Sequence, residues 1–412
     1  MKKPSARLAA GVALVAAVAV LTGCSSSSPE TNSGSSPVTL NLLDEFTTPP
    51  ASPKLDSLIK QYEAANPGVK IVRTSVPQGQ GVTKLTQGVA AGSPPDIVFF
   101  DSPNTQQYAA QGLVENLSSK VSGWATKSQY YSGAWSSTQY NGGTYSIPLY
   151  SDAPGIYGNM DMLAAAGITA LPATWTQLQD DAKALTKNGV SGLCFGTTPG
   201  AAADYLFMPY VWQVGEANDF AKSALPSLQL FQQMKADGSI PQDVLSWTWQ
   251  DAWTAFQNKS CAIVFGGPWN AGDAAKLPFK VAAAIPPQKS TDKQASELGG
   301  YNVGIGKGGN LDAAWKFINW FTSKKVLGDY LAATTQLPNR KDLADLSFIK
   351  ADPFLPTFVQ SIAIGKARTF GANLPQVDTA IMTAYQSVLA GKSTPAQAAQ
   401  QGQATIDPLL SK

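Results

Sequence analysis

The feature that most constrains the fold is an alternation of short apolar runs and helix-spaced apolar residues that begins at residue 38. Short apolar strands are predicted over 38–43, 69–76 and 97–100. Between them, apolar side chains at 55, 58, 59 and 62, and again at 82, 85 and 89, follow the spacing of one helix face. This β-α-β-α-β order predicts a parallel sheet with helices on both faces, which is an α/β fold.

The order of elements becomes less regular after Pro148. A helix is predicted over 174–185, because Thr174 and Gln177 have the spacing of a capping box, T-x-x-Q. Further strands are predicted over 193–197, 262–265 and 301–305, and another helix over 313–321.

The first 24 residues indicate export from the cytoplasm. Lys2, Lys3 and Arg7 precede an apolar run of 14 residues, 8–21, which is shorter than the roughly 20 residues that span a bilayer but suits a signal peptide. The run ends in Leu21-Thr22-Gly23-Cys24, which resembles the lipobox of bacterial lipoproteins, whose cysteine receives diacylglycerol. The alternative is an ordinary signal peptide with an incidental cysteine.

A serine-rich stretch follows and favours the lipoprotein interpretation. Residues 25–37 are rich in Ser, Gly and Pro, which bury little surface and predict a flexible tether. We therefore expect a signal peptide over 1–23, a tether over 24–37, and a protein held by lipid on Cys24 at the outer face of the cell membrane.

Composition excludes several kinds of chemistry. The chain has no histidine, so Ser-His-Asp and Cys-His catalysis, histidine general bases and histidine-ligated metals are ruled out. Charged residues make up only 14%, and without the three basic residues of the leader the chain has 27 basic against 28 acidic side chains. We expect no nucleic-acid partner, no metal and no cofactor.

Two cysteines remain beyond the lipobox. Outside the cytoplasm such a pair is usually oxidised, so Cys194 and Cys261 are predicted to form a disulfide. Two buried free thiols are the alternative.

A series of short motifs resembles the bacterial extracellular solute-binding family that includes maltose-binding protein. The resemblance covers nearly all of 38–412, and the motifs are weak singly but specific in their joint order behind a lipobox. In chain order they are Pro95-Asp96-Ile97-Val98 leading to Asp101, Ala109-Ala110-Gln111-Gly112-Leu113-Val114, Tyr145-Ser146-Ile147-Pro148, Ile156-Tyr157-Gly158-Asn159, Ala166-Gly167-Ile168 with Pro172-Ala173-Thr174-Trp175, Gly266-Gly267-Pro268-Trp269, Gly299-Gly300-Tyr301-Asn302 and Leu337-Pro338-Asn339-Arg340.

The resemblance implies a two-lobed periplasmic-binding-protein-like fold. Each lobe is a sheet flanked by helices, three crossings join the lobes, and the ligand lies between them. Mapped onto this chain, the first lobe comprises 38–149 and 302–335, and the second comprises 150–300 and 338–412.

The ends of the predicted strands supply the first candidate ligand residues. In an open α/β sheet, ligands lie at the carboxyl ends of strands, which places Asp44, Glu45, Phe46 and Asp101 at the cleft. A sugar needs polar groups for its hydroxyls and aromatic planes for its ring faces, and these residues offer both. Each acid could instead be a solvated strand end or a helix cap.

The resemblance adds further candidates. Trp269 matches the family's stacking tryptophan, although a core tryptophan is the alternative. A crossing that commonly touches ligand in this family is matched by Gly300, Tyr301 and Asn302. The remaining candidates lie on other cleft segments and could equally be core residues or ion-pair partners. They are Asp152, Asp204, Tyr205, Arg340 and Arg368.

Two other patterns need weighing. The segment 304–309 satisfies G-x-G-x-x-G, but the predicted helix after it leads to no strand ending in an acid, as dinucleotide binding requires. Acids near the cleft could also form the carboxylate pair of a glycoside hydrolase, whose separation a sequence does not give.

We therefore predict a solute-binding lipoprotein, not an enzyme, that closes two lobes on a sugar and delivers it to the permease of an ABC importer. A monomer is expected. The alternatives are a secreted carboxylate-dependent glycoside hydrolase, or the same fold binding another ligand. A glycerol-phosphate ester would favour Arg340 and Arg368, whereas a polyamine would favour Asp44, Glu45, Asp101 and Asp204.

Overall fold

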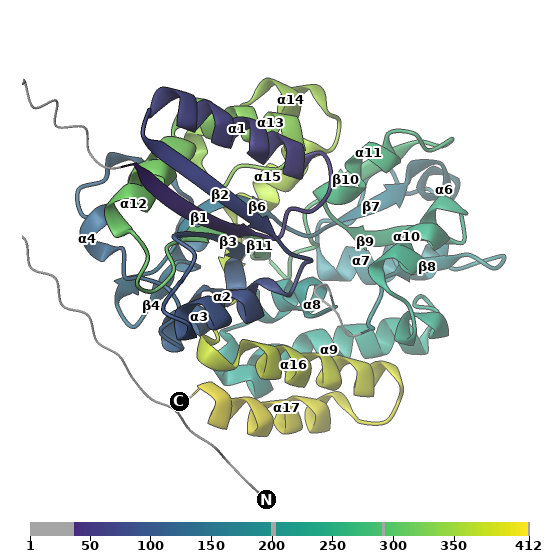
Figure 1. Cartoon of the computed structure of the whole chain (residues 1–412). Helices are drawn as coiled ribbons and strands as arrows, with labels where there is room; N and C mark the ends of the chain where they lie inside the picture. The colour runs from purple at the N-terminus through teal and green to yellow at the C-terminus, as the bar shows by residue number, and fades with distance from the viewer. Residues whose placement is uncertain (1–36, 199–202, 291–292, 411–412) are drawn as a thin grey trace, which may run out of the picture. The chain divides into compact units, whose positions relative to one another are not determined.

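The computed structural model describes residues 37–198, 203–290 and 293–410, and this part of the chain contains two larger sheets surrounded by helices (Figure 1). The strands of the larger sheets are β1 (Val38–Asp44), β2 (Val69–Ser75), β3 (Ile97–Asp101), β6 (Ile147–Asp152), β7 (Gly155–Asn159), β8 (Ser191–Cys194), β9 (Cys261–Gly266), β10 (Val281–Ala284), β11 (Ser296–Gly304) and β12 (Gly365–Ala367). A short hairpin is formed by β4 (Gln139–Tyr140) and β5 (Gly143–Thr144).

The α-helices of the described chain are α1 (Ala51–Ala65), α2 (Gly81–Ala90), α3 (Thr105–Ala110), α4 (Ser118–Val121), α5 (Ser132–Ser136), α6 (Met160–Ala165), α7 (Trp175–Leu185), α8 (Ala203–Trp212), α9 (Phe220–Ala236), α10 (Trp249–Gln257), α11 (Ala271–Ala274), α12 (Leu311–Phe321), α13 (Lys324–Thr334), α14 (Ser347–Ala351), α15 (Leu355–Ala363), α16 (Leu374–Leu389) and α17 (Pro395–Leu410). The predicted capping box is present, with Thr174 and Gln177 bonded reciprocally at the start of α7.

The first sheet confirms the predicted alternation in part. Its strands lie in the order β12-β11-β3-β1-β2, with β6 also paired to β11. Strand β1 is parallel to both β2 and β3, as predicted. Strand β11 is antiparallel to both β3 and β6, so the sheet as a whole is mixed rather than parallel.

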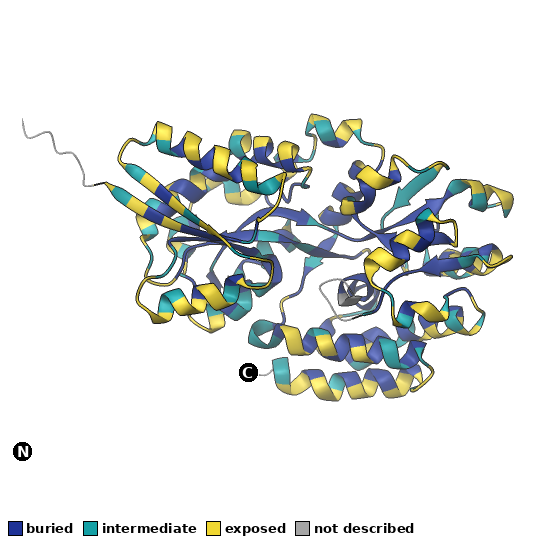
Figure 2. Ribbon diagram, turned by 45° about the vertical axis from the view of Figure 1, so that its right-hand side comes forward, coloured by how far each residue is buried: buried dark blue, intermediate teal, exposed yellow. Residues whose placement is uncertain are grey.

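Helices cover both faces of this sheet because alternate strand residues point to opposite sides. Leu42 and Phe99 pack with α1 and α12 on one face, whereas Leu43 and Phe100 pack with α2 and α3 on the other. Each of these helices has one buried face, toward the sheet, and one exposed face on the opposite side, as Figure 2 shows. The predicted two-sided α/β arrangement is therefore confirmed.

The second sheet lies in the order β10-β7-β9-β8. Strand β8 agrees less well with the sequence prediction than the strands of the first sheet do, since it covers Ser191–Cys194 rather than 193–197. Phe195 and Thr197 are buried beyond the end of β8, and Thr197 donates its backbone N–H to Val244 and Trp247 instead of continuing the strand ladder. The apolar run over 193–197 indicates only that these residues are buried. A strand and a buried loop both fit that pattern.

The predicted disulfide is present between neighbouring strands of the second sheet. Cys194, in β8, is joined to Cys261, in β9, and their Cα atoms lie 6.2 Å apart. Both residues are fully buried.

This bond makes a testable prediction about thiol content. In the chain carrying Cys24→Ser, the denatured but unreduced protein should show no reactive thiol, and reduction should release two. Titration with a thiol reagent before and after reduction checks this. Two thiols that react without reduction would contradict the bond.

Three chain segments run side by side where the two lobes meet. Strand β6 pairs with β11, and the backbone N–H of Ser151 in β6 donates to the carbonyl of Leu337 at 3.0 Å. These are the positions at which the three crossings are predicted. The exact lobe boundaries stay a prediction, and Leu343, which the predicted map assigns to the second lobe, packs in the core of the first lobe with Leu327 and Tyr330.

The glycine-rich segment after β11 is a tight packing loop. A β-carbon on Gly306 would lie 2.2 Å from the carbonyl oxygen of Pro95, so the loop can approach the β3 strand only without a side chain there. The segment leads into α12 and then α13, not into a strand, which removes the dinucleotide interpretation.

No helix within 37–198, 203–290 or 293–410 has the length and hydropathy needed to cross a membrane. Cys24 and the predicted signal peptide lie outside the described residues.

Candidate ligand-binding site

A cavity of about 370 Å³ lies at the carboxyl ends of β3 and β6. Its lining residues are Gln78, Asp101, Asp152, Tyr205, Trp249, Trp269, Gly299, Gly300, Tyr301 and Arg368. Most of the predicted ligand residues are thus brought together from distant parts of the chain: Asp101, Asp152, Tyr205, Trp269, Gly300, Tyr301 and Arg368. Their contact with a ligand stays a prediction.

The floor of the cavity is the central part of β11. Asp101 of β3 is the register partner of Tyr301, and Asp152 of β6 is the partner of Gly299, so the two carboxyl-bearing residues flank β11. A β-carbon on Gly299 would lie 2.3 Å from Oδ1 of Asp152, and Gly300 has a φ of +104°. Glycine is needed at both positions, because a side chain would displace Asp152 or strain the backbone.

The two acids at the floor are held in an unfavourable electrostatic setting. Burial raises the pKa of Asp101 to about 7, with Arg368 opposing the rise and Asp152 and Glu45 adding to it. Burial also raises the pKa of Asp152, while the Tyr205 hydroxyl, which donates to its Oδ1 at 2.8 Å, opposes that shift. The cavity thus contains two carboxyl groups whose ionised forms are only partly stabilised by their surroundings.

The raised pKa of Asp101 predicts a pH-dependent stability. An aspartate in an unfolded chain has a pKa of about 4. Between that value and about 7 the folded chain binds more protons here than the unfolded chain does, so this group's contribution to stability falls as pH rises. Because Asp101 still reaches solvent, we expect a change on the order of 1–2 kcal/mol across this range.

Urea unfolding at a series of pH values checks this expectation. The Asp101→Asn variant should lose this part of the pH dependence and gain stability relative to the unmodified chain at the alkaline end. The Asp312→Asn variant, which removes an exposed acid on α12, should keep it. Identical pH profiles for Asp101→Asn and the unmodified chain would contradict the assignment.

One wall of the cavity is aromatic. Trp269 follows β9 in a short 3₁₀ turn, Pro268–Asn270, and is 39% exposed. Its ring lies 6.1 Å from that of Tyr205 and 6.2 Å from that of Trp249, centroid to centroid, with the two indoles at 73°. A β-carbon on Gly267 would lie 2.3 Å from the Trp269 ring, so the Gly-Gly-Pro turn lets the indole fold back over the backbone.

Arg368 lines the cavity but is also bound to acids beneath it. Its Nε lies 2.7 Å from Oε1 of Glu297, and its Nη1 lies 2.7 Å from Oδ2 of Asp378. Glu297 is fully buried. The sequence left open whether this guanidinium meets a ligand or pairs with an acid, and the structure shows the pairing.

Glu45 lies at the edge of the site rather than in its wall. Its Oε1 accepts the backbone N–H groups of Gly79 and Gly81, and its Oε2 accepts the Tyr301 hydroxyl at 3.1 Å. Glu45 therefore holds a cavity residue in place. It also anchors the start of α2, close to Gln78.

Asp44 and Phe46 are not at the cavity. Asp44 is fully buried and accepts two bonds from the Arg73 guanidinium, at 2.7 and 2.8 Å, as well as one from the Ser75 hydroxyl. Phe46 is packed in the core of the first lobe with Phe99. Their placement in the cavity wall is corrected: Asp44 faces Arg73 of β2, and the Phe46 ring packs behind the lining against Tyr150, Tyr301 and Tyr330.

Asn302 and Arg340 are also turned inward. The Asn302 amide donates to the hydroxyls of Thr105, Ser137 and Ser146 and is buried. Arg340 is bonded through Nε and Nη2 to Asp342, at 2.9 and 2.7 Å. Asp204 lies in the first turn of α8, outside the residues whose side chains the structure describes.

Comparison with known families identifies the chain. Residues 48–327 match the family model described as bacterial extracellular solute-binding protein. The match covers more than half of the sequence. The chain belongs to this family.

Relatives of this solute-binding protein are distant in sequence and close in fold. A binding protein of Brucella abortus (strain 2308) is 23% identical over 87% of this chain and 90% of its own length. The multiple sugar-binding protein of Streptococcus mutans is 25% identical over 67% of this chain and 69% of its own length. The crystal structure of the cyclic alpha-maltosyl-1,6-maltose binding protein from Arthrobacter globiformis superposes with a TM-score of 0.81 at 22% identity, covering 91% of this chain and 99% of that one. The two-lobed fold is thereby confirmed.

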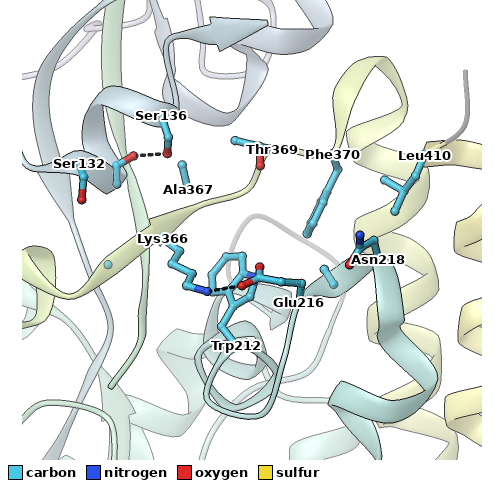
Figure 3. Close-up of a pocket in the computed structure, with 13 residues that line it drawn as sticks. Ser132, Ser136, Trp212, Glu216, Asn218, Lys366, Ala367, Thr369, Phe370 and Leu410 are labelled. Carbon is cyan, nitrogen blue, oxygen red and sulfur yellow. Dashed lines mark hydrogen bonds and ion pairs between the residues drawn. The ribbon is translucent and has the colours of Figure 1, made fainter. Parts of the chain in front are cut away.

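A second and larger cavity, of about 530 Å³, lies beside β12 (Figure 3). Its lining comes from α5, β12 and the chain after α8, and the exposed ion pair between Lys366 and Glu216 extends across it. The smaller cavity is the candidate ligand site of this solute-binding protein, because it lies at the strand ends and combines acids with exposed indoles.

Three lining residues escaped sequence reasoning: Gln78, Trp249 and Gly299. Trp249 begins α10 and is 42% exposed, although tryptophan is usually a core residue. A local signal was present, since Thr248 and Asp251 form a capping box that places Trp249 in the first turn of a helix. No local pattern indicates that this turn faces Trp269.

The described part of the chain has no group of three or more acidic or cysteine side chains placed to hold a metal ion.

Proposed function

We propose that this solute-binding protein captures a sugar or oligosaccharide between its two lobes and delivers it to the permease of an ABC importer. The observation that carries the proposal is the smaller cavity, where acids at two strand ends face a pair of exposed indoles. The multiple sugar-binding protein of Streptococcus mutans and the maltosyl-maltose binding protein of Arthrobacter globiformis support the choice of a sugar.

The chemistry of a sugar suits this cavity. Asp101 and Asp152 offer acceptors for hydroxyl groups, and the indole faces of Trp249 and Trp269 suit the apolar faces of pyranose rings. Closing the lobes would exclude water and strengthen each of these hydrogen bonds. The crossings at β6 and β11 form the floor of the cavity, so a change in lobe angle would reach a sugar bound there.

A thermal-shift screen of the purified chain against a carbohydrate panel, followed by calorimetry, tests the proposal. At least one sugar should raise the melting temperature and bind with a measurable heat. A panel that includes oligosaccharides, glycerol-phosphate esters and polyamines and yields binding only by a phosphate ester or a polyamine would overturn it.

The same panel separates binding from hydrolysis. Asp101 and Asp152 are two carboxyl groups in one cavity, which a glycoside hydrolase also requires. We expect a bound oligosaccharide to be recovered intact by chromatography after prolonged incubation. Shorter products that accumulate with time, and that Asp101→Asn abolishes, would support the hydrolase instead.

The arginines favour a sugar over a phosphate ester. Arg340 is buried and bonded to Asp342, and Arg368 is held by Glu297 and Asp378. A phosphate would have to compete with these carboxylates for both guanidinium groups, and would meet Asp101 and Asp152 at the floor of the cavity.

We further propose that the protein is held at the outer face of the membrane by diacylglycerol on Cys24. The leader, the lipobox and the serine-rich tether support this. Mass spectrometry of the membrane fraction should find the lipid adduct on Cys24, and Cys24→Ser should release the protein from membranes. A soluble mature chain that begins at another residue would contradict the anchor.

A further inference from the structure

Acidic side chains outnumber basic ones in and around the cavity. Asp101 and Asp152 line it, and the arginine that lines it, Arg368, lies against two further carboxylates, those of Glu297 and Asp378. No lysine is among the described residues that form its walls. Four carboxyl groups therefore surround this one guanidinium, even before the nearby Glu45 is considered.

The aromatic wall adds to the same preference. Trp249 and Trp269 are exposed side by side, and Tyr205 and Tyr301 are the other aromatic residues of the lining. The faces of these rings carry partial negative charge and attract cations, indoles most strongly. The acids and the ring faces thus both contribute negative electrostatic potential to the cavity.

We infer that the physiological ligand carries a protonated amine, and that it is an amine-bearing sugar rather than a neutral one. This inference rests on the proposed function and narrows it. A neutral sugar could donate hydroxyl hydrogen bonds to Asp101 and Asp152, but it would leave the two desolvated carboxylates to share one counter-charge, Arg368, with Glu297 and Asp378 when the lobes close. An ammonium group supplies three donors and the missing charge together.

The titration of the site agrees with this picture. The pKa of Asp101 is raised by burial and by the nearby acids Asp152 and Glu45, despite the opposing effect of Arg368. An ammonium group placed between Asp101 and Asp152 would favour their ionised forms. Negative potential in a cavity would also concentrate cationic ligands at its mouth.

Matched sugars that differ at one substituent test the inference. Glucosamine, N-acetylglucosamine and glucose, each as the free sugar and as its β-1,4 disaccharide, are titrated calorimetrically into the full chain near neutral pH. The amine form should bind at least about tenfold more tightly than its acetylated and hydroxyl counterparts. The difference should shrink as salt is raised, because salt screens the charge interaction.

Variants locate the effect. Asp101→Asn and Asp152→Asn should each reduce the preference for the amine by several-fold while changing the affinity for the hydroxyl form less. Asp312→Asn removes an equal charge on the exposed start of α12 and should leave the preference unchanged. Melting curves of the variants exclude a loss of folding as the cause.

The outcomes separate this inference from the proposed function. A neutral sugar that binds as tightly as its amine counterpart, or a neutral ligand found in the wider panel while no amine form binds, overturns the inference and leaves sugar capture standing. Binding of spermidine with no binding of any sugar overturns both. Equal loss of preference in Asp312→Asn and Asp101→Asn would assign the effect to net charge and also overturn the inference.

Discussion

Replacing Trp269 by alanine should weaken sugar binding by about tenfold to a hundredfold and leave the fold intact. An indole face stacked on a sugar ring contributes roughly 1–3 kcal/mol through apolar burial and ring orientation. Each 1.4 kcal/mol or so corresponds to a factor of ten in affinity. Because the side chain is 39% exposed and borders a cavity, its removal opens little buried space in either core.

Calorimetric affinity and melting temperature, measured on the same variant, decide between a binding role and a core role. Trp320→Ala is the matched control. The Trp320 indole, on α12, packs against Tyr62 of α1 away from the cavity, so its loss should not change the affinity. Trp249→Ala should resemble Trp269→Ala, since the two indoles share one wall. A large fall in stability with unchanged affinity would show that Trp269 is a core residue.

Replacing Arg368 by alanine should destabilise the chain by about 3–5 kcal/mol. Its guanidinium lies 2.7 Å from the carboxylate of Glu297, whose side chain is 0% exposed, and 2.7 Å from that of Asp378. Removing one partner of a buried ion pair leaves a desolvated charge behind, which is far less favourable than the loss of a surface pair. Chemical denaturation, followed by fluorescence of the tryptophans, measures the change.

Lys366→Ala provides the control two residues away. Its ion pair with Glu216 is exposed on both sides, so its loss should change stability by less than about 1 kcal/mol. Adding Glu297→Gln to Arg368→Ala should restore part of the lost stability, because the buried charge is then removed as well. A change in Arg368→Ala as small as that in Lys366→Ala would contradict a structural role for this arginine.

Several features could be predicted from sequence patterns: the alternating α/β order, the capping box of α7, the pairing of the two cysteines and the placement of Asp101 and Trp269 at strand ends. Apart from the cysteine pairing, which follows from the number of cysteines and the expected compartment, these features are local: they depend on the periodicity of apolar residues, on cap spacing, or on the position of a residue directly after a strand. The glycines before Trp269 and Tyr301 also carried information, because close backbone approaches at the cavity need them.

Which strand-end and crossing residues reach the cavity depends on packing between distant segments and could not be predicted from the sequence. Asp44 and Asp101 both end parallel strands of one sheet, yet Asp44 lies against Arg73, which the neighbouring strand β2 supplies, whereas no such cation faces Asp101 from its own strand neighbours. Trp249 joins Trp269 because α10 and the turn after β9 meet in space. A carboxylate or an indole has the same sequence neighbours whether it faces a partner or a ligand, so the packing of distant segments made the distinction.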